Sequence, residues 1–354
     1  MSTHTISPAR FDAGALQQAV DGVIEEFLAQ KAQAADSHMA HLVGLLAEFG
    51  AGGKRIRPLL AVTGWQAASG LPADESVVRV AASLEMFHSF ALIHDDVMDD
   101  SDTRRGHPTI HRTLANHQRD SRAERFGRSG AILLGDLALT WSDEILFTAG
   151  LTPAQLGTVL PLVTEMRTEV MRGQYLDLRA TGELHDDVDA TLDVIRYKTA
   201  KYTIERPLHI GAALAGAGDD VMAACTAYAL PLGEAFQLRD DLLGVYGNEQ
   251  DTGKSRLDDL REGKNTTLVA LALRASDGAQ SALLHTLIGD PFLDESGAEE
   301  VRAVFEATGA REAVERMIDD RYWEALRALD TAPFTAEATT TLKYLARKAT
   351  RRNS

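Results

Sequence analysis

The sequence of 354 residues contains a single cysteine, Cys225. One cysteine cannot form an internal disulfide, which excludes a small disulfide-stabilised fold. Cys225 lies in the apolar stretch 221–232, where a buried structural thiol is the expected state. We therefore assign it no catalytic role.

Positive charge is also scarce. The chain has 36 Lys and Arg against 52 Asp and Glu, for a net charge of -16 and a pI near 5.1. Nucleic-acid-binding proteins need a basic face to neutralise phosphates. We therefore do not expect this acidic protein to bind nucleic acids in general. Any polyanionic ligand must be bound by a local cluster of basic residues.

Long hydrophobic runs are missing as well. Residues 1–14 lack a basic start followed by an apolar run, so no secretory signal is expected. No later run is apolar for long enough to predict a transmembrane segment. The 45% hydrophobic and 25% charged residues are instead typical of a protein with a sizeable core. We expect a cytoplasmic protein.

Alternating Val/Ile/Thr runs of the strand type are rare, whereas stretches rich in Ala, Leu, Glu and Arg have apolar residues three and four positions apart. This pattern predicts an all-α fold, a single large helical bundle. Glycine- and proline-containing breakers divide it into many helices, among them residues 50–53, 104–108 and 152–153. Residues 1–35 are expected to form a leader and first helix, and residues 36–354 the main domain.

An acidic cluster follows the apolar helical run 84–94. In a helix, Asp95 and Asp99 lie about 6 Å apart along the axis, where like charges repel. A divalent cation such as Mg²⁺, which prefers oxygen ligands, would relieve that repulsion. A solvated acidic helix end is the plain alternative, but the apolar run before the cluster favours a cavity.

Basic residues follow this cluster directly. Arg104 and Arg105 present planar guanidinium groups suited to phosphate oxygens. His107, His111 and His117 raise the possibility of a zinc site, which the interruption by Pro108 and the lack of a thiol disfavour.

The arrangement of an apolar helix followed by paired carboxylates recurs at residues 233–244. Gln237 lies about one turn before Asp240 and Asp241, so an amide and two carboxylates share one helix face. The simplest packing is one cavity with two acidic walls.

Further basic residues occur singly. Lys54 and Arg57 follow Gly52 and Gly53, an arrangement that suits a second, metal-free anion site or an ordinary charged loop. Isolated lysines in so acidic a chain are usually solvated surface residues. The lysines considered as candidates are Lys198, Lys254 and Lys264.

Together these motifs resemble the trans-prenyl diphosphate synthase family, which makes geranyl, farnesyl and geranylgeranyl diphosphates. The family's GGKRxRP, DDxxD followed by RRG, GQxxD, KT and FQxxDD motifs have counterparts in this order over residues 40–350. The resemblance implies an isoprenoid synthase-like bundle with a central cavity. It also implies condensation of isopentenyl diphosphate with an allylic diphosphate, and a homodimer, which the many apolar helical faces also favour.

The resemblance assigns roles to individual residues. About three Mg²⁺ ions, with Mn²⁺ as a substitute, would bind the aspartates. The implied metal ligands are Asp95, Asp96, Asp99, Asp177, Asp240 and Asp241. The implied contacts of the allylic diphosphate are Arg104, Lys198, Lys254 and Lys264, and those of isopentenyl diphosphate are Lys54, Arg57, His88 and Arg105. Lys198, Thr199 and Gln237 would stabilise the carbocation, and Gln174 would face the cavity with Asp177.

Two features bear on the product and the second wall. Many family members have a third aspartate where this chain has Gly244, which puts the metal affinity of that wall in doubt. Phe90 lies five residues before Asp95, about 7 Å along a helix, and Phe87 about 12 Å. With the small Ala91, this pattern is most similar to geranylgeranyl diphosphate synthases. Core packing is the alternative role of both phenylalanines.

Four other functions were compared with this one. A farnesyl or longer-chain synthase differs only in product length. A terpene cyclase shares the bundle but needs no second diphosphate site, so Lys54 and Arg57 disfavour it. The two aspartate pairs argue against a non-catalytic partner subunit, and the single Glu85/His88 pair argues against a di-iron oxidase.

Overall fold

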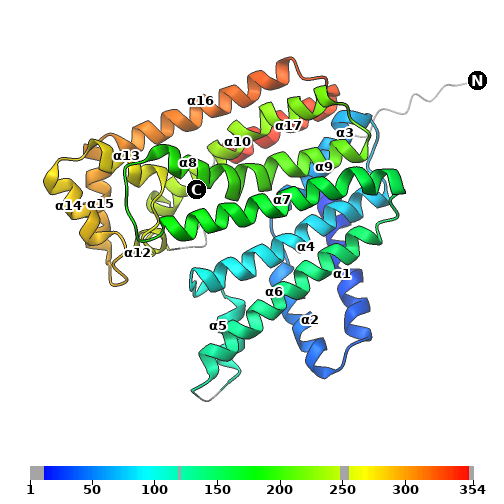
Figure 1. Ribbon diagram of the computed structural model, residues 1–354, viewed down its shortest axis with the longest axis horizontal. Helices are drawn as coiled ribbons and strands as arrows, with labels where there is room; N and C mark the ends of the chain where they lie inside the picture. The colour runs from blue at the N-terminus through cyan, green and yellow to red at the C-terminus, as the bar shows by residue number, and fades with distance from the viewer. Residues whose placement is uncertain (1–11, 119–120, 248–254, 351–354) are drawn as a thin grey trace, which may run out of the picture.

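The computed structural model describes residues 12–118, 121–247 and 255–350. These residues form an almost entirely helical structure (Figure 1). The elements of the first half are α1 (Ala13–Gln33), α2 (Ser37–Gly50), α3 (Ile56–Ser69), α4 (Glu75–Met98), β1 (Thr103–Arg104), β2 (His107–Pro108), α5 (Ile110–Asn116), α6 (Ala123–Phe147) and α7 (Pro153–Ala180). Those of the second half are α8 (Val188–Ile195), η1 (Arg196–Glu205), α9 (Arg206–Leu214), α10 (Asp219–Tyr246), α12 (Asp258–Arg261), α13 (Thr267–Ala275), α14 (Gly278–Leu287), α15 (Glu295–Ala307), α16 (Ala310–Asp330) and α17 (Ala336–Thr350).

Side-chain caps account for where many of the helices begin. The helix α7 starts at Pro153, and Thr152 and Gln155 exchange the reciprocal hydrogen bonds of a capping box. Several others begin after an aspartate whose carboxylate accepts backbone N–H groups, which also suits the positive end of the helix dipole. These aspartates are Asp12, Asp36, Asp74, Asp187, Asp277 and Asp294. Part of the chain's acidity is therefore used to start helices.

The core consists of three buried clusters. One joins α1, α2, α4, α6 and α7 around Phe87 and Ile93. A second joins α10 to α13, α15 and α16 around Leu238 and Phe305, and a third joins α3, α9, α10, α16 and α17 around Tyr228. Figure 1 shows α12 to α15 gathered at the left end of the molecule and α2 and α5 along its lower edge. The helix α10 takes part in two clusters and links the parts of the bundle.

The helix α1 packs onto the same core. Its residues Val20, Phe27 and Leu28 are buried in the cluster that contains α4. Phe27 makes an edge contact with Trp141 on α6, with ring centroids 6.1 Å apart. Thus α1 is a structural part of the bundle.

The central helix α4 differs from the expectation that no segment is apolar for long enough to span a membrane. Among the described helices, it alone has the length and composition of a membrane span. However, 61% of its most apolar window is buried inside the bundle. A core helix that is apolar on all sides meets the same measure as a membrane span.

The segment η1 between α8 and α9 is a ten-residue π-helix. Its i to i+5 hydrogen bonds widen the helix, so residues four and five positions apart share a face. Lys198, Thr199, Tyr202 and Thr203 consequently all line one cavity. Such π-helical turns are frequent at functional sites.

Candidate active site

A cavity with two connected lobes lies between α4, α7, η1 and α10. The larger lobe, of about 760 Å³, has an apolar part and a basic part. The other lobe, of about 470 Å³, is lined by carboxylates of both acidic motifs, and we call it the acidic lobe. Residues that line both lobes are Lys54, Leu92, Asp95, Lys198, Thr199 and Gln237. The two acidic motifs, about 145 positions apart in the sequence, thus face one space.

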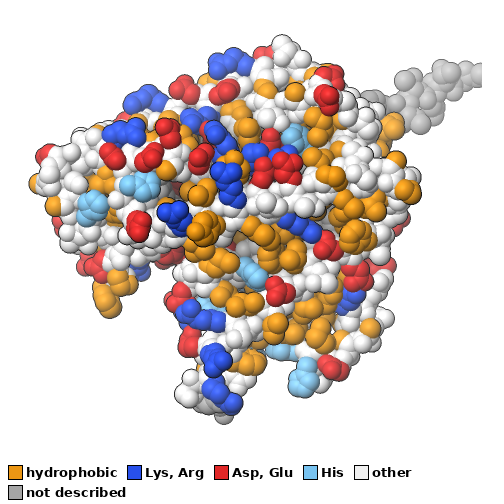
Figure 2. All heavy atoms as spheres, in the orientation of Figure 1, with side chains coloured by type: hydrophobic (Ala, Val, Ile, Leu, Met, Phe, Trp, Pro, Cys, Tyr) orange, Lys and Arg blue, Asp and Glu red, His pale blue; other side chains and the backbone are white. Residues whose placement is uncertain are grey.

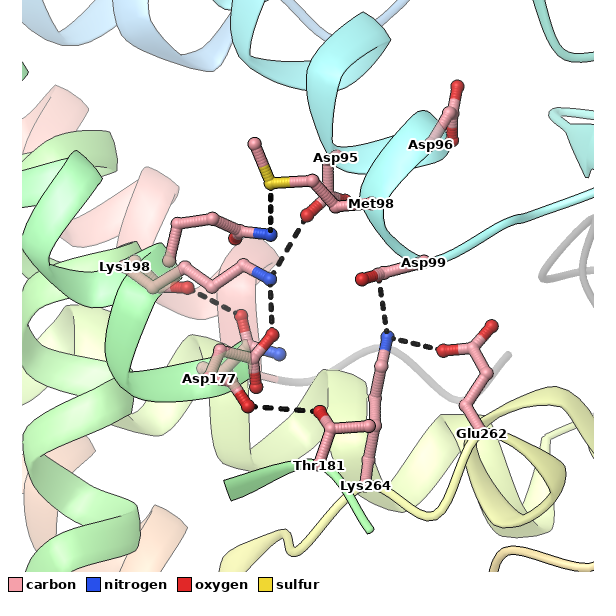
Figure 3. A network of polar contacts seen from close by, with 12 residues as sticks. Asp95, Asp96, Met98, Asp99, Asp177, Thr181, Lys198, Glu262 and Lys264 are labelled. Carbon is pink, nitrogen blue, oxygen red and sulfur yellow. Dashed lines mark hydrogen bonds and ion pairs between the residues drawn. The ribbon is translucent and has the colours of Figure 1, made fainter. Parts of the chain in front are cut away.

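The first acidic wall is the end of α4. Figure 3 shows Asp95 and Asp99 directed toward two lysines, Lys198 from η1 and Lys264 from the segment before α13. The Lys198 Nζ lies 2.6 Å from Asp177 Oδ2 and 3.1 Å from Asp95 Oδ1. The Lys264 Nζ lies 3.4 Å from Asp99 Oδ2 and 2.8 Å from Glu262. Both lysines are therefore bound inside the site and are not solvated surface residues.

Asp96 has a different environment from Asp95 and Asp99. It is 1% exposed, and Figure 3 shows it pointing away from the lysines. Its carboxylate accepts a hydrogen bond from Arg104 Nε at 2.7 Å, and Arg104 Nη2 also lies 3.4 Å from Asp95 Oδ2. In this structure Asp96 therefore holds Arg104 against the wall.

The charges of this wall shift one another's pKa values. Burial disfavours the charged form of Asp95, but Lys198, Arg104 and Lys264 outweigh it and hold the pKa of Asp95 below its usual value. Burial raises the pKa of Asp99 despite Lys264. Burial also disfavours the ammonium of Lys264, yet Asp259, Asp99 and Glu262 raise its pKa well above the usual value. The lysines are charged at neutral pH.

The second acidic wall lies on α10. Gln237 Nε2 donates to Asp241 Oδ1 at 2.8 Å, while its amide oxygen accepts a hydrogen bond from Thr199 Oγ1 at 2.7 Å. A carboxylate can only accept, so the amide nitrogen of Gln237 faces Asp241 and the oxygen faces η1. Burial, with smaller effects of Asp259 and Asp240, raises the pKa of Asp241 to about 7. This wall retains carboxylate charge that a cation would stabilise.

Gly244 leaves space for a carboxylate from another segment. A Cβ atom at Gly244 would lie 2.1 Å from Asp259 Oδ2. The carboxylate of Asp259 occupies that space, and it lines the acidic lobe with Asp240 and Asp241. A side chain at position 244 is therefore incompatible with this arrangement.

The helix α7 approaches η1 closely at Gly173. A Cβ there would lie 2.3 Å from the backbone nitrogen of Lys198, so only glycine permits this contact. The contact brings Asp177 to Lys198, and Gln174 lines the larger lobe with its Nε2 3.7 Å from Met98 Sδ. The two residues of the GQxxD motif thus face different lobes.

A hairpin separates the two neighbouring arginines. The strands β1 and β2 pair Thr103 with Pro108 and Arg104 with His107. The residues between them, Arg105 and Gly106, have φ values of 55° and 79°, as in a type I′ turn. Arg104 lines the acidic lobe and Arg105 the larger lobe.

The basic part of the larger lobe contains Lys54, Arg57, His88 and Arg105. Burial and the charges of Arg57, Arg104 and Arg105 lower the pKa of His88 well below its usual value, so its imidazole is neutral. Arg55, by contrast, is 5% exposed and forms ion pairs with Asp21 and Glu85. Arg55 is the middle basic residue of the GGKRxRP motif, and these ion pairs give it a structural role.

The apolar part of the larger lobe begins on the N-terminal side of the first wall, along α4. Phe90 and Ala91 line the cavity with Val170, Met171 and Phe236. Phe87 is 1% exposed and lies behind Phe90, with ring centroids 5.2 Å apart, and it does not line the lobe. The structure thus separates the positions of the two phenylalanines.

Other candidate residues lie outside this cavity. Lys254 falls outside the described residues. In the described ranges, no three His, Cys, Asp or Glu side chains are grouped so that they alone could hold a metal ion. His111 is 1% exposed and His107 is exposed. Cys225 is fully buried, and burial raises its pKa to about 12.

Cavity or network residues that the sequence reasoning missed include Tyr202, Thr203, Asp259 and Glu262. Tyr202 and Thr203 follow Lys198 by four and five positions, so a π-helical periodicity would have found them. Asp259 and Glu262 lie near Lys264 in sequence, but their approach to α4 and α10 depends on tertiary packing.

The donor set fits a hard divalent cation. Asp95, Asp240 and Asp241 supply oxygen atoms around one lobe, and Asp99 lies beside it at Lys264. Mg²⁺ prefers such ligands together with substrate phosphates. Burial raises the pKa of Asp241 to about 7, so a bound cation would stabilise its ionised form. Since no three acidic side chains of the described chain converge fully, the phosphates of a substrate would complete the coordination.

Comparisons with known proteins show the family of this chain. Residues 41–307 match the polyprenyl synthetase family. A geranylfarnesyl diphosphate synthase of Aeropyrum pernix is 36% identical over 227 residues, which cover 63% of this chain and 67% of that protein. A geranylgeranyl diphosphate synthase of Saccharolobus solfataricus is 31% identical over 302 residues, which cover 84% of this chain and 86% of that protein.

A solved structure is similar over nearly the whole chain. It is the geranylgeranyl pyrophosphate synthase of Corynebacterium glutamicum complexed with isoprenyl diphosphate and magnesium, with a TM-score of 0.92 and 37% identity. The match covers 97% of this chain and 100% of that one. The chain belongs to the polyprenyl synthetase family and has its all-α isoprenoid synthase fold.

Proposed function

We propose that this prenyltransferase condenses isopentenyl diphosphate with an allylic diphosphate and that its main product is geranylgeranyl diphosphate. The observation that carries the proposal is the meeting of two acidic walls, on α4 and α10, in one cavity beside a separate basic group. Two anion sites of different character suit two diphosphates, one bound through metal and one bound directly. The names of the relatives support the same reaction.

Magnesium is the proposed cofactor, in about three ions, with Mn²⁺ as a substitute. The metal would be held by Asp95, Asp99, Asp240 and Asp241, and by Asp96 if Arg104 moves to the substrate. Bound there, it would neutralise the charge of the departing diphosphate. The magnesium in the C. glutamicum synthase supports this cofactor.

The chain's own residues would bind and protect the reacting groups. Lys198, Lys264 and Arg104 carry charges next to the first wall and would contact the allylic diphosphate as its C–O bond breaks. Thr199 and Gln237, which line both lobes, would place their dipoles beside the carbocation. The basic part of the larger lobe would hold isopentenyl diphosphate so that its double bond reaches that cation.

The product length would be set below the first wall. Phe90 and Ala91 line the apolar part of the larger lobe, one to two turns before Asp95. The growing chain would extend from the acidic lobe toward them. The relatives include synthases named for geranylgeranyl and geranylfarnesyl products, so the lobe's own side chains must select between them.

We further propose that the protein is a cytoplasmic homodimer. Figure 2 shows hydrophobic side chains gathered on the surface over α6. Leu133 is 61% and Phe147 58% exposed on this helix, together with Phe126 and Ile132. A second copy is the expected partner of such a surface. Light scattering should give twice the monomer mass, and Leu133→Glu should lower it.

The reaction is tested by incubating the protein with isopentenyl diphosphate, Mg²⁺ and each allylic primer in turn. Chromatography after dephosphorylation should show geranylgeraniol as the main alcohol. A main product of farnesol would overturn the assigned length while supporting the reaction. Hydrocarbon formed from geranylgeranyl diphosphate alone would instead identify a terpene cyclase.

A further inference from the structure

Tyr202 lies between two residues of the basic part of the larger lobe. Its side chain is 3% exposed and comes from the π-helix η1, whereas Arg57 comes from α3 and His88 from α4. The ring of Tyr202 lies under the Arg57 guanidinium, with Cζ 4.1 Å from the ring centroid. The Tyr202 hydroxyl lies 3.2 Å from His88 Nδ1. One side chain therefore contacts both groups.

In the part of the chain that the structure describes, Arg57 is held without an ion pair to a carboxylate. Its Nη2 donates to Thr203 Oγ1 at 2.7 Å, and within residues 12–118, 121–247 and 255–350 its buried Nε has no hydrogen-bond partner. Two residues before it, Arg55 is neutralised by Asp21 and Glu85. Stacking on an aromatic ring fixes a guanidinium while leaving its charge available for an anion.

The hydroxyl of Tyr202 also contacts the imidazole of His88. Burial raises the pKa of Tyr202 to about 12, so the hydroxyl keeps its proton. A neutral imidazole can accept that proton at Nδ1, which leaves the hydrogen on Nε2. The Nε2–H is then a donor for the cavity that His88 lines. Phe87 packs against the Tyr202 ring at a centroid distance of 5.8 Å and limits its movement.

We infer that Tyr202 is a positioning residue for the diphosphate of isopentenyl diphosphate. Its ring supports the charge of Arg57 and its hydroxyl orients the donor of His88. This inference rests on the proposed function, because it concerns one of the two diphosphates named there. It adds a cavity-lining residue that aligns two groups proposed to contact that diphosphate.

The test compares Tyr202→Phe with Tyr228→Phe. Tyr228 is an equally buried tyrosine whose hydroxyl donates to the Leu342 carbonyl at 2.8 Å, away from the cavity. Tyr202→Phe should raise the KM for isopentenyl diphosphate about fivefold and leave the KM for the allylic substrate unchanged. Tyr202→Leu, which also removes the ring, should raise it roughly tenfold or more. Tyr228→Phe should leave both unchanged.

A second readout does not depend on turnover. In ¹⁵N NMR spectra of the unliganded protein, the His88 signals of Tyr202→Phe should move from the Nε2–H tautomer toward a mixture, with His88→Asn used for assignment. Isopentenyl diphosphate should also bind the metal-free Tyr202→Leu variant more weakly by calorimetry. If the proposed reaction were wrong, the tautomer shift would still occur.

The inference is overturned if Tyr202→Phe has the same His88 tautomer and the same KM for isopentenyl diphosphate as the native protein. It is also overturned if the KM values for both substrates rise equally, since that would indicate general damage to the core. Should the Tyr202 variants fail to fold, Thr203→Val keeps the side-chain volume and removes the acceptor for Arg57. It should raise the KM for isopentenyl diphosphate severalfold, and an unchanged value would contradict the positioning of Arg57.

Discussion

The two acidic walls both begin with an aspartate pair but are neutralised differently. On α4, Asp95 and Asp99 lie next to the ammonium groups of Lys198 and Lys264. On α10, Asp241 takes its hydrogen bond from the neutral amide of Gln237. The pKa of Asp95 is accordingly lowered, whereas that of Asp241 is raised to about 7. Two aspartate pairs thus form one wall balanced by lysines and one wall whose ionised form an added cation would stabilise.

The largest expected effect comes from removing a carboxylate from either wall. Asp95→Ala and Asp241→Ala should each lower kcat/KM about a thousandfold, because each leaves the diphosphate charge less stabilised in the transition state. Steady-state assays with saturating Mg²⁺ would measure this. Asp319→Ala, an exposed residue of α16, is the control and should have native activity. Full activity of a folded Asp95→Ala protein would contradict the role of the first wall.

The lysines of the first wall provide the next test. Lys264→Met should lower kcat/KM about a hundredfold. Without metal it should also destabilise the protein by about 2 kcal/mol, because Asp99, Glu262 and Asp259 lose their shared cation. Added Mg²⁺ should recover part of that stability in thermal unfolding. Lys343→Met, at an exposed ion pair with Asp330, should change neither property. No difference between the two variants would show that Lys264 is only a surface charge.

The sequence predicts which residues form this site better than it predicts which charges neutralise one another. Helical periodicity gave the all-α bundle, and the spacing of Asp95, Asp99, Asp240 and Asp241 indicated two walls. Spacing along one chain carries no information on which lysine approaches which carboxylate. The approach of Lys264 to Asp99 joins segments 165 positions apart. Such contacts depend on how the helices pack.

The π-helix and the glycine positions illustrate the same limit. The sequence of η1 indicates a Lys-Thr motif but no π-helix, so it does not identify Tyr202 as facing the cavity. Gly244 was interpreted as a lost carboxylate, whereas the structure places Asp259 in its space. A glycine indicates that another group occupies the space of its missing side chain, but it does not identify that group.

A smaller effect is expected from pH. The folded-state pKa of Asp241 is raised from 3.8 to about 7, so its stabilising contribution is complete below the unfolded pKa and is lost as pH rises through about 7. The metal-free protein should therefore become less stable as the pH rises through about 7. Stabilisation by Mg²⁺, which needs the ionised form of Asp241, should increase over the same pH range. Calorimetry with and without Mg²⁺ at about pH 6 and pH 8 would measure both trends.

Two variants separate the walls in this pH test. Asp241→Asn should remove most of the trend, because it removes the titrating group. Asp95→Asn should leave it in place, because the pKa of Asp95 is lowered and it stays ionised throughout this range. The same trend in both variants would mean that another group titrates.

Gly244 tests how the second wall uses Asp259. Gly244→Ala should displace the Asp259 carboxylate, whose Oδ2 lies 2.1 Å from the added Cβ, and weaken Mg²⁺ binding about tenfold. Isothermal titration with a diphosphate present would measure the affinity. Gly157→Ala on α7, where no atom lies within 4 Å, is the matched control and should slightly stabilise its helix. Equal metal binding in the two variants would exclude a role of Asp259 in this wall.

The smallest effect on rate, but a change of product, is expected below the first wall. Phe90→Ala should lengthen the product, because Phe90 lines the larger lobe one to two turns before Asp95 and its removal deepens the apolar part. Phe87→Leu should leave the product unchanged, since Phe87 lies behind Phe90 outside the cavity lining. Chromatography of the dephosphorylated products compares the two variants. If Phe87→Leu lengthens the product and Phe90→Ala does not, the floor of the lobe lies deeper than Phe90, and α4 supplies the metal wall without Phe90 setting the chain length.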